Sequence, residues 1–314
     1  MDTATGVDSD GSVRSPEGRC RTRRARTALH CSLSRARARS AAPLSLTPCS
    51  AAFLATQKAY ASPADLWREV EADLEGGWYG KAVAYWDAQP ATDDGVLGGH
   101  ADAVAAADVE QSEAFLARAL GPRRLAAAAA GGKKGEPPLV AADCGAGVGR
   151  VSRDLLLRFC AVVDLVEPSA HLLAAARARL GSAVKEAGAG LVGAPRAFLQ
   201  TGLQAWAPAP ASYDVVWVQW ALLYLTDADA IAFLARAAGA LKPGGVLVVK
   251  ENVAASGFVV DREDRSLTRS HPYMLDLGRA AGLTCVADAR QRGFPAGLFG
   301  VRMYAWRKAG GGSA

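Results

Sequence analysis

The sequence predicts an α/β fold built on a Rossmann-like, mostly parallel sheet. From Leu139 onward, short apolar runs alternate with helical stretches, a pattern typical of a parallel sheet covered on both faces. One run leads into a glycine-rich loop, "DCGAGVGR", and another follows a Lys-Pro-Gly-Gly turn. With 314 residues, of which 50% are hydrophobic, the chain is long enough to bury a sizeable core.

Five apolar runs are the predicted strands: 139–143, 162–167, 197–201, 214–219 and 245–250. Helices are expected near 149–160, 169–180 and 227–241, with one more after Pro272. Two final runs, 283–291 and 299–306, can pair as an antiparallel edge. The core domain is therefore expected over residues 139–307, with a flexible tail at 308–314.

An N-terminal helical cap with a substrate loop is expected over residues 61–120. Residues 63–75 and 109–120 have helical patterns, and 78–100 is aromatic at first and turn-rich afterwards. The stretch "GPRRLAAAAAGGKKGEPP", residues 121–138, is predicted to be a low-complexity connector or loop.

Residues 1–60 hold the basic excess of the chain. They carry ten Arg and Lys residues against four acids, a net charge of +6 against +5 for the whole chain. A disordered basic tail, an organelle transit segment and a nucleic-acid contact all remain open for this Arg/Ser-rich segment. The remaining residues sum to −1, so nucleic-acid binding is not expected of the core.

We expect the protein in the cytoplasm, the nucleus or both, and organelle targeting by the N-terminus is the alternative. No apolar stretch approaches the roughly 18–20 residues of a membrane-spanning helix, so no membrane partner is expected. The six cysteines form no CxxC pair and no His lies at zinc-ligand spacing, so no metal is predicted.

The glycine loop and the acid that follows it indicate a nucleoside-containing ligand. Glycines let the backbone approach a ligand closely, but Arg150 occupies the last glycine position of a dinucleotide GxGxxG, which argues against NAD. Glu167 ends the second strand about 20 residues on, where a carboxylate can hold ribose hydroxyls. It can also be an acid at a helix start, with Ser169 as the N-cap.

The glycine loop, Glu167 and "ALKPGGVLVVKEN" together resemble the class I S-adenosylmethionine-dependent methyltransferases. That family's fold is a seven-stranded sheet with an antiparallel last strand. A narrower resemblance rests on "YGKAVAYWDAQPATDDGVLGGH", "YDVVWVQWALLYLTD" and "KENVAASGFVVDREDRS". These look like the protein α-N-terminal methyltransferases, which methylate the α-amine of proteins beginning Xaa-Pro-Lys or Xaa-Pro-Arg. The resemblance covers roughly residues 78–307.

The resemblance implies S-adenosyl-L-methionine as cofactor and a set of contacts at strand ends. The implied cofactor-binding residues are Gly145, Gly147, Arg150, Glu167, Pro168, Ser169, Gly202, Leu203 and Gln219. Among them, Arg150 can pair with the methionine carboxylate, and "TGLQAW" would line the adenine.

On the substrate side, the resemblance places Trp220 against the second-residue proline, although core packing is the ordinary role of such a tryptophan. Trp86 helps to shape the pocket, and Leu97 and Gly98 belong to a loop over the peptide. Three further residues face the substrate: Asn252 fixes the first residue's backbone, and Asp261 and Ser266 accept the third-residue cation.

The implied catalytic residues are Asp264, Asn252 and Tyr224. Asp264 matches the carboxylate that takes the amine proton or passes it to water. Tyr224 stands where the family has a histidine, and a tyrosine is a poor base at neutral pH. Two alternatives stay open: a small-molecule class I methyltransferase, and a weakly catalytic regulator that binds N-termini.

Overall fold

The structure is a computed structural model that describes residues 60, 62–72, 77–130, 138–185 and 190–309. The predictions for residues 1–59 and for 310–314 lie outside the described residues, as do those for 61, 73–76, 131–137 and 186–189.

Seven strands form one sheet in the order β3-β2-β1-β4-β5-β9-β8. They are β1 (Val140–Cys144), β2 (Val162–Val166), β3 (Ala194–Leu199), β4 (Tyr213–Gln219), β5 (Leu241–Val253), β8 (Leu283–Arg290) and β9 (Gly300–Lys308). The first five are parallel, and β9 runs antiparallel between β5 and β8. The predicted sheet, with its antiparallel last strand, is confirmed.

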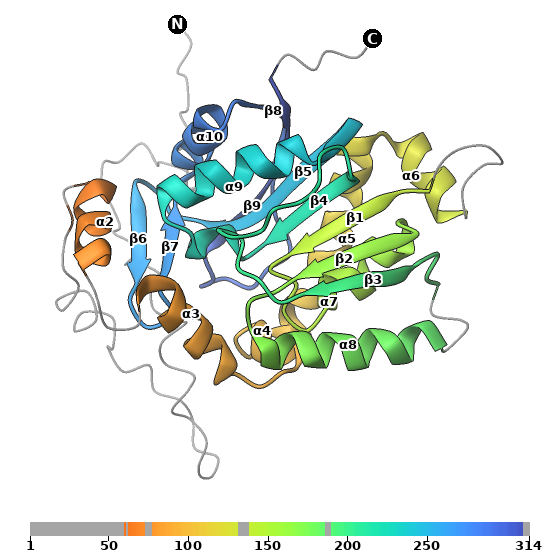
Figure 1. Cartoon of the computed structure of the whole chain (residues 1–314), viewed down its shortest axis with the longest axis horizontal. Coiled ribbons are helices and arrows are strands. Elements are labelled where there is room, and N and C mark those ends of the chain that lie inside the picture. The colour runs from red at the N-terminus through yellow and green to blue at the C-terminus, as the bar shows by residue number, and fades with distance from the viewer. Residues whose placement is uncertain (1–59, 61, 73–76, 131–137, 186–189, 310–314) are drawn as a thin grey trace, which may run out of the picture.

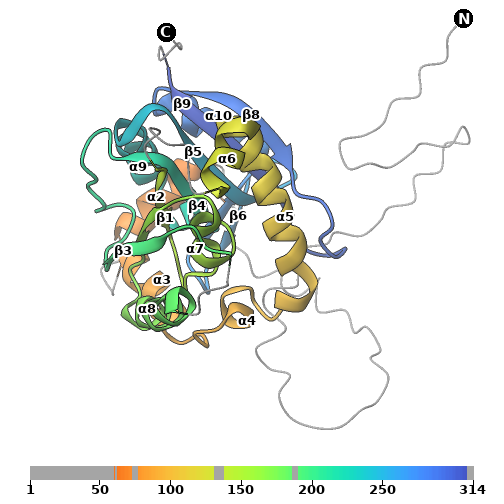
Figure 2. The ribbon, with the colours of Figure 1, turned by 90° about the vertical axis from the view of Figure 1, so that its right-hand side faces the viewer.

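Helices cover both faces of the sheet (Figures 1 and 2). One face carries α5 (Ala101–Leu120), α6 (Pro122–Ala129), α7 (Arg150–Asp154), the 3₁₀ turn η1 (Leu156–Arg158) and α8 (Ala170–Lys185). The other carries α9 (Asp227–Gly239) and α10 (His271–Ala280). The predicted helix at 149–160 is thus an α-helix followed by a 3₁₀ turn.

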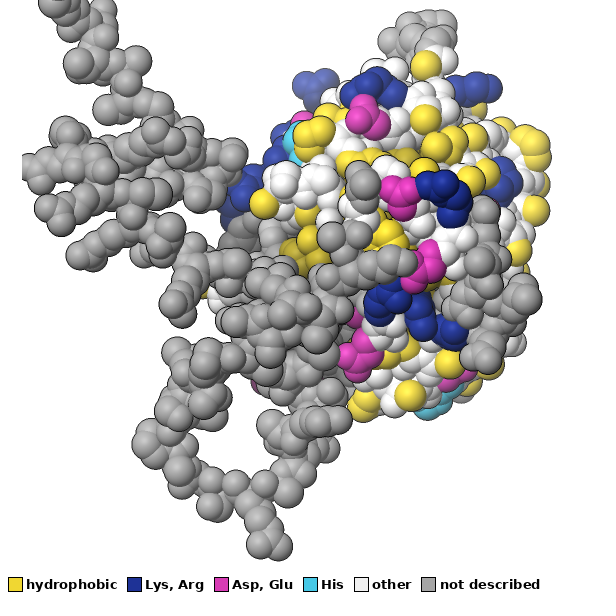
Figure 3. Space-filling view, turned by 90° about the vertical axis from the view of Figure 1, so that its left-hand side faces the viewer, with side chains coloured by type: hydrophobic (Ala, Val, Ile, Leu, Met, Phe, Trp, Pro, Cys, Tyr) yellow, Lys and Arg dark blue, Asp and Glu magenta, His cyan; other side chains and the backbone are white. Residues whose placement is uncertain are grey.

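A separate group of elements packs at the carboxyl ends of the strands. It comprises α2 (Pro63–Ala72), α3 (Gly77–Asp87), α4 (Asp93–Val96) and the hairpin of β6 (Phe258–Asp261) and β7 (Ser266–Arg269). Figure 3 views the end of the molecule where α2, α3 and the hairpin lie, and there the visible acidic and basic side chains are interspersed with apolar ones.

Several helices and strands begin at residues other than those predicted from the sequence. Helix α5 begins at Ala101, eight residues before the predicted 109, and α3 is a helix where only an aromatic segment was expected. The predicted connector contains α6, which begins with Pro122 in its first turn. Strand β5 begins at Leu241 because the Pro-Gly-Gly turn forms an irregularity inside it, with Gly244 at φ +75°. The β6–β7 hairpin was not predicted.

Hydrogen bonds tie α2 and the hairpin to the core. Trp67 Nε1 of α2 donates to Asp227 Oδ2 at 2.9 Å, and the buried Arg269 of β7 donates to Asp227 Oδ1 at 2.7 Å. The Trp67 ring meets that of Trp78 edge to face, with 5.5 Å between centroids. Asp227 therefore fixes the position of the hairpin and of the helix beside it.

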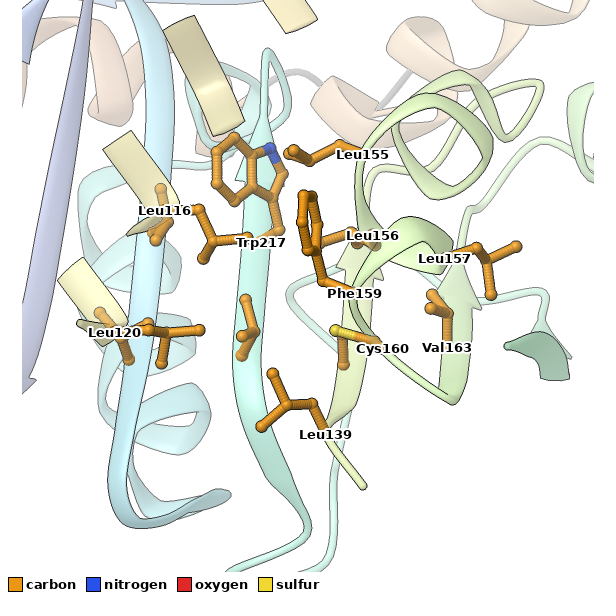
Figure 4. Close-up of a cluster of buried hydrophobic side chains, with 14 of the residues drawn as sticks. Leu116, Leu120, Leu139, Leu155, Leu156, Leu157, Phe159, Cys160, Val163 and Trp217 are labelled. Carbon is orange, nitrogen blue, oxygen red and sulfur yellow. The ribbon is translucent and has the colours of Figure 1, made fainter. Parts of the chain in front are cut away.

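Side chains alternate between the faces of each strand, so successive residues of β4 enter different cores. Trp217 packs with Leu116, Leu156 and Phe159 on the face of α5 and η1 (Figure 4). Val216, one residue earlier, lies in the cluster beneath α9 and α10. The run at 213–219 is apolar throughout because the strand is buried on both sides.

We expect Leu156→Ala to lower the free energy of unfolding by about 2–5 kcal/mol, because Leu156 is 0% exposed and its truncation leaves a cavity. Urea denaturation of the two proteins measures the difference. Leu199→Ala is the matched control, since Leu199 is 36% exposed and its truncation should change stability by less than about 1 kcal/mol. Equal losses for the two variants would contradict the assignment of Leu156 to the core.

Candidate active site

A pocket opens at the carboxyl ends of the parallel strands, where open α/β sheets bind ligands. All nine predicted cofactor residues line it: Gly145, Gly147, Arg150, Glu167, Pro168, Ser169, Gly202, Leu203 and Gln219. Four predicted substrate or catalytic residues line it too: Trp86, Leu97, Trp220 and Tyr224. Helix α3 forms one wall with Tyr79, Ala82, Val83 and Trp86, which share a helix face.

The glycine loop after β1 requires glycine at the floor of the pocket. Gly145, Gly147 and Gly149 have φ of +79°, +53° and +76°, a region that side chains disfavour. A Cβ on Gly145 would lie 2.2 Å from the Cβ of Ala221, in the loop after β4. The loops after β1 and β4 therefore approach each other as closely as glycine allows.

Glu167 holds the rim of the glycine loop from the end of β2. Its carboxylate accepts hydrogen bonds from the backbone N–H of Gly147 and of Ser169, each at 2.9 Å. Ser169 Oγ donates to Asp87 Oδ1 at 2.5 Å, which ties the end of α3 to the same rim. Burial raises the pKa of Glu167 to about 7, although the hydrogen bonds from Gly147 and Ser169 act to lower it. Both roles predicted for Glu167, ribose acceptor and helix-start acid, are compatible with this position.

Arg150 and Gln219 meet at a buried carboxylate, Asp108 of α5. Arg150 Nη1 donates to Asp108 Oδ2 at 2.7 Å, and Gln219 Nε2 donates to the same carboxylate at 2.9 Å. Lys250 Nζ of β5 lies 2.5 Å from Asp108 Oδ1. Burial alone would raise the pKa of Asp108, but the charges of Lys250 and Arg150 hold it below its usual value.

A second buried carboxylate, Glu251 of β5, fixes the loop after β4. Its Oε1 accepts hydrogen bonds from the backbone N–H of Ala221 at 2.9 Å and of Leu222 at 2.8 Å. Just before them Trp220 adopts φ +51°, a left-handed conformation that costs a residue with a Cβ on the order of 1–2 kcal/mol. The Trp220 indole lies 5.8 Å from the Arg150 guanidinium and 6.5 Å from the Phe294 ring.

Tyr224, from the 3₁₀ turn η2 (Leu222–Tyr224), connects the pocket to the hairpin. Its hydroxyl donates to Asp264 Oδ2 at 3.3 Å, and its ring meets that of Trp86 edge to face at 6.1 Å. Asp264 lies between β6 and β7, is 5% exposed, and accepts a hydrogen bond from Ser266 N at 3.0 Å. Burial, with the charge of Asp261, raises the pKa of Asp264 to about 7. Burial raises the pKa of Tyr224 well above its usual value.

The other predicted substrate residues lie beside the pocket and are not among its lining residues. Asp261 and Ser266 are paired across the hairpin, so these two predicted residues share one turn with Asp264. Asn252 lies in β5 opposite Val301, and Gly98, at φ +62°, follows Leu97 after α4.

Asp108, Lys250 and Glu251 were not among the predicted site residues, and Trp86 is the one residue of the α3 wall that was. The helical spacing of residues 79, 82, 83 and 86 is a signal that could have identified the α3 wall. No local signal distinguishes Asp108 from the other acids of α5, Asp102, Glu110 and Glu113, because its partners are 42 to 142 positions away in the sequence.

The pocket fits S-adenosylmethionine in the chemistry of its walls. Leu172 and Leu203 offer apolar surface for a base, Glu167 offers a carboxylate for a ribose, and Arg150 offers a cation for a carboxylate. Among the described residues, no group of three or more His, Cys, Asp or Glu is placed to hold a metal ion. In the same part of the chain, no helix is long and apolar enough to cross a membrane.

The fold and the site define a class I methyltransferase with S-adenosylmethionine as cofactor. Residues 74–307 match the profile of the AdoMet-dependent proline di-methyltransferases, and the chain belongs to this family. Alpha N-terminal protein methyltransferase 1 of Arabidopsis thaliana is 44% identical over 79% of this chain and 87% of its own length.

Two further relatives cover similar parts of the chain. N-terminal Xaa-Pro-Lys N-methyltransferase 1 of Bos taurus is 36% identical over 74% of this chain and 96% of its own length. The solved structure of an S-adenosylmethionine-dependent methyltransferase of Leishmania major has a TM-score of 0.66 and 36% identity, over 79% of this chain and 92% of that one.

We expect Gly145→Ala to weaken binding of S-adenosylhomocysteine by at least about tenfold, because the added Cβ collides with Ala221 and displaces one of the two loops. Isothermal titration calorimetry measures the affinity. Gly190→Ala is the matched control: it adds the same strain at φ +66°, but nothing lies within 4 Å of its Cβ. Parent-like affinity in Gly145→Ala would show that the contact between the loops is not needed for binding.

Proposed function

We propose that this protein transfers methyl groups from S-adenosylmethionine to the α-amine of proteins that begin Xaa-Pro-Lys or Xaa-Pro-Arg. One observation carries the proposal: a buried carboxylate, Asp264, contacts the pocket through Tyr224 and has a pKa of about 7. A base of that strength matches an α-amine, whose pKa is about 7.7–8.0. The activities for which the relatives from Arabidopsis and Bos are named support the same function.

The residues of the pocket have complementary roles toward the cofactor. When bound, S-adenosylmethionine supplies a methyl group on a positively charged sulfur, and the amine nitrogen displaces the sulfur by forming a bond to that methyl. Arg150 would hold the methionine carboxylate, Glu167 would accept hydrogen bonds from the ribose hydroxyls, and Leu203 would offer apolar surface to the base. Each role uses a side chain that lines the pocket.

Asp264 removes the proton that makes the amine unreactive. The substrate enters as an ammonium ion, which the buried carboxylate attracts, and Asp264 takes one proton to free the nitrogen lone pair. Tyr224 orients the carboxylate by donating to Oδ2, while Ser266 N binds Oδ1. Because the proton moves over a small pKa difference, most of the acceleration comes from positioning.

The remaining residues select the peptide. Trp220 presents its indole to the second-residue proline, beside Trp86 and the loop of Leu97 and Gly98. Asn252 holds the backbone of the first residue. Asp261 and Ser266 accept the cationic third residue. Residues 261–266 carry three acids against two arginines, a net charge of −1, which favours a cation.

The direct test is a peptide panel with labelled S-adenosylmethionine and the full chain. We expect methylation of the α-nitrogen of a Ser-Pro-Lys peptide, located by fragment mass spectrometry. A Ser-Ala-Lys peptide and an α-acetylated Ser-Pro-Lys peptide are the controls and should remain unmodified. Cofactor binding without any transfer would favour a regulator that only binds N-termini, and transfer restored by Tyr224→His would assign that weakness to the tyrosine.

The dependence of kcat/KM on pH should follow the ionisation of Asp264 on its acid side. Because its pKa is raised from 3.8 to about 7, the carboxyl is protonated and inactive below pH 7, so kcat/KM should rise through that pH. Asp264→Asn should lose about 100-fold or more in kcat/KM, and Glu263→Gln, an exposed acid in the same turn, should keep the parent profile.

The dependence of unfolding on pH tests the raised pKa of Asp264 independently of activity. A raised pKa in the folded state means that the stabilising contribution of Asp264 is complete below about pH 4 and is lost as the pH rises through 7. We therefore expect Asp264→Asn to unfold at higher temperature than the parent at pH 8.5, although it is inactive. A less stable Asp264→Asn protein would mean that the carboxylate is structural.

A further inference from the structure

Behind the wall of the pocket lies a cluster of two cations and one carboxylate. Asp108 of α5, Arg150 of α7 and Lys250 of β5 are 1%, 5% and 0% exposed. Arg150 belongs to the pocket wall, whereas Asp108 and Lys250 do not. Lys250 is therefore a buried charge next to the cofactor pocket that does not reach the pocket itself.

Lys250 uses all three of its donors inside the protein. Its Nζ lies 2.5 Å from Asp108 Oδ1, and it donates to the Asp108 backbone carbonyl at 3.1 Å and to Ser112 Oγ at 2.8 Å. No donor is left to bind a ligand. Burial lowers the pKa of Lys250 to about 8, so the amine is still mostly protonated at neutral pH.

Arg150 is engaged differently. Among the described residues its one hydrogen bond joins Nη1 to Asp108 Oδ2, and its guanidinium lies over the Trp220 ring in the pocket wall. A guanidinium has five N–H donors, so the others remain for a ligand. If Asp108 had Arg150 as its only cation, the pair would be neutral, and an incoming carboxylate would gain little.

We propose that Lys250 is a charge-balancing residue for the cofactor: it offsets the carboxylate of Asp108, so that Arg150 keeps a net positive charge for the carboxylate of the methionine moiety. The incoming carboxylate then completes a buried cluster of two cations and two anions. Lys250 acts through Arg150 and touches no reacting atom. This inference depends on the placement of the cofactor's carboxylate at Arg150 that the proposed function makes.

The other charged group near Arg150 is Asp143, at the end of β1. It accepts a hydrogen bond from Ser152 Oγ at 2.7 Å, and burial raises its pKa to about 6. Because Asp143 is unchanged in every variant below, its charge cancels when variants are compared.

The experiment compares two ligands that differ only in the carboxylate: S-adenosylhomocysteine and S-adenosyl-3-thiopropylamine. Calorimetry at pH 7 gives the dissociation constant of each ligand. The value for S-adenosyl-3-thiopropylamine divided by that for S-adenosylhomocysteine is a ratio that measures the contribution of the carboxylate and not the integrity of the pocket. We expect Lys250→Met to reduce this ratio about tenfold, since it removes one charge of the cluster at close range. Lys242→Met, a lysine of the same strand paired with Asp214, should leave the ratio unchanged.

A double variant separates charge balance from packing. Lys250→Met combined with Asp108→Asn removes one cation and one anion, and should restore the ratio to within about threefold of the parent's. A ratio that stays low in the double variant, or that is unchanged in Lys250→Met, overturns the proposal. If Lys250→Met alone does not fold, the double variant decides: a parent-like ratio supports charge balance and a tenfold loss overturns it.

Arg150→Met distinguishes a failure of this inference from a failure of the carboxylate's placement. It should lower the ratio whatever Lys250 does, because it removes the direct partner. An unchanged ratio in Arg150→Met would mean that the carboxylate lies elsewhere, and then the placement falls together with the role of Lys250. A loss in Arg150→Met without one in Lys250→Met would remove only the inference about Lys250.

Discussion

The two hydrogen bonds from Ala221 and Leu222 to Glu251 determine where a methyl-transfer site can form in this fold. They hold the backbone after β4 in a turn that puts Trp220 in a left-handed conformation and begins the 3₁₀ turn carrying Tyr224. Within the described chain, Glu251 Oε2 has no hydrogen-bond partner, and burial raises the pKa of Glu251 to about 8. A carboxyl so placed opposes stability, and we infer that it is kept because it positions this loop.

Strand β5 connects the two halves of the site through alternation. Lys250 points toward α5 and Asp108, and Glu251, the next residue, points toward the loop after β4. Asn252 returns to the first face at the end of the strand. Three consecutive residues thus reach Asp108 behind the cofactor wall, the turn before Tyr224 and the proposed substrate side. A one-residue shift of β5 against β4 would exchange all three positions, so the register between Gln219 and Lys250 is a condition for activity.

The nine residues predicted to bind the cofactor line one pocket because they follow strand ends. Gly145, Glu167 and Gln219 each end or follow an apolar run, and a parallel sheet brings such positions to one edge. The remainder depends on contacts that local patterns do not contain. Asp108 meets Gln219 from 111 positions away, and the β6–β7 hairpin is specified by the docking of its Arg269 onto Asp227 as much as by its local turn residues. The roles of Asn252, Asp261 and Ser266 remain predictions.

In the proposed reaction, Tyr224, in place of the histidine implied by the family resemblance, leaves proton removal to one group, Asp264. A phenol with a raised pKa stays protonated at neutral pH and can only donate to Asp264. A donated hydrogen bond favours the ionised carboxylate, so it cannot be what raises the pKa of Asp264 to about 7. Burial and the neighbouring Asp261 do so. The hairpin therefore desolvates the carboxylate that the proposed function uses as its base, and Tyr224 donates a hydrogen bond to that carboxylate without sharing its proton.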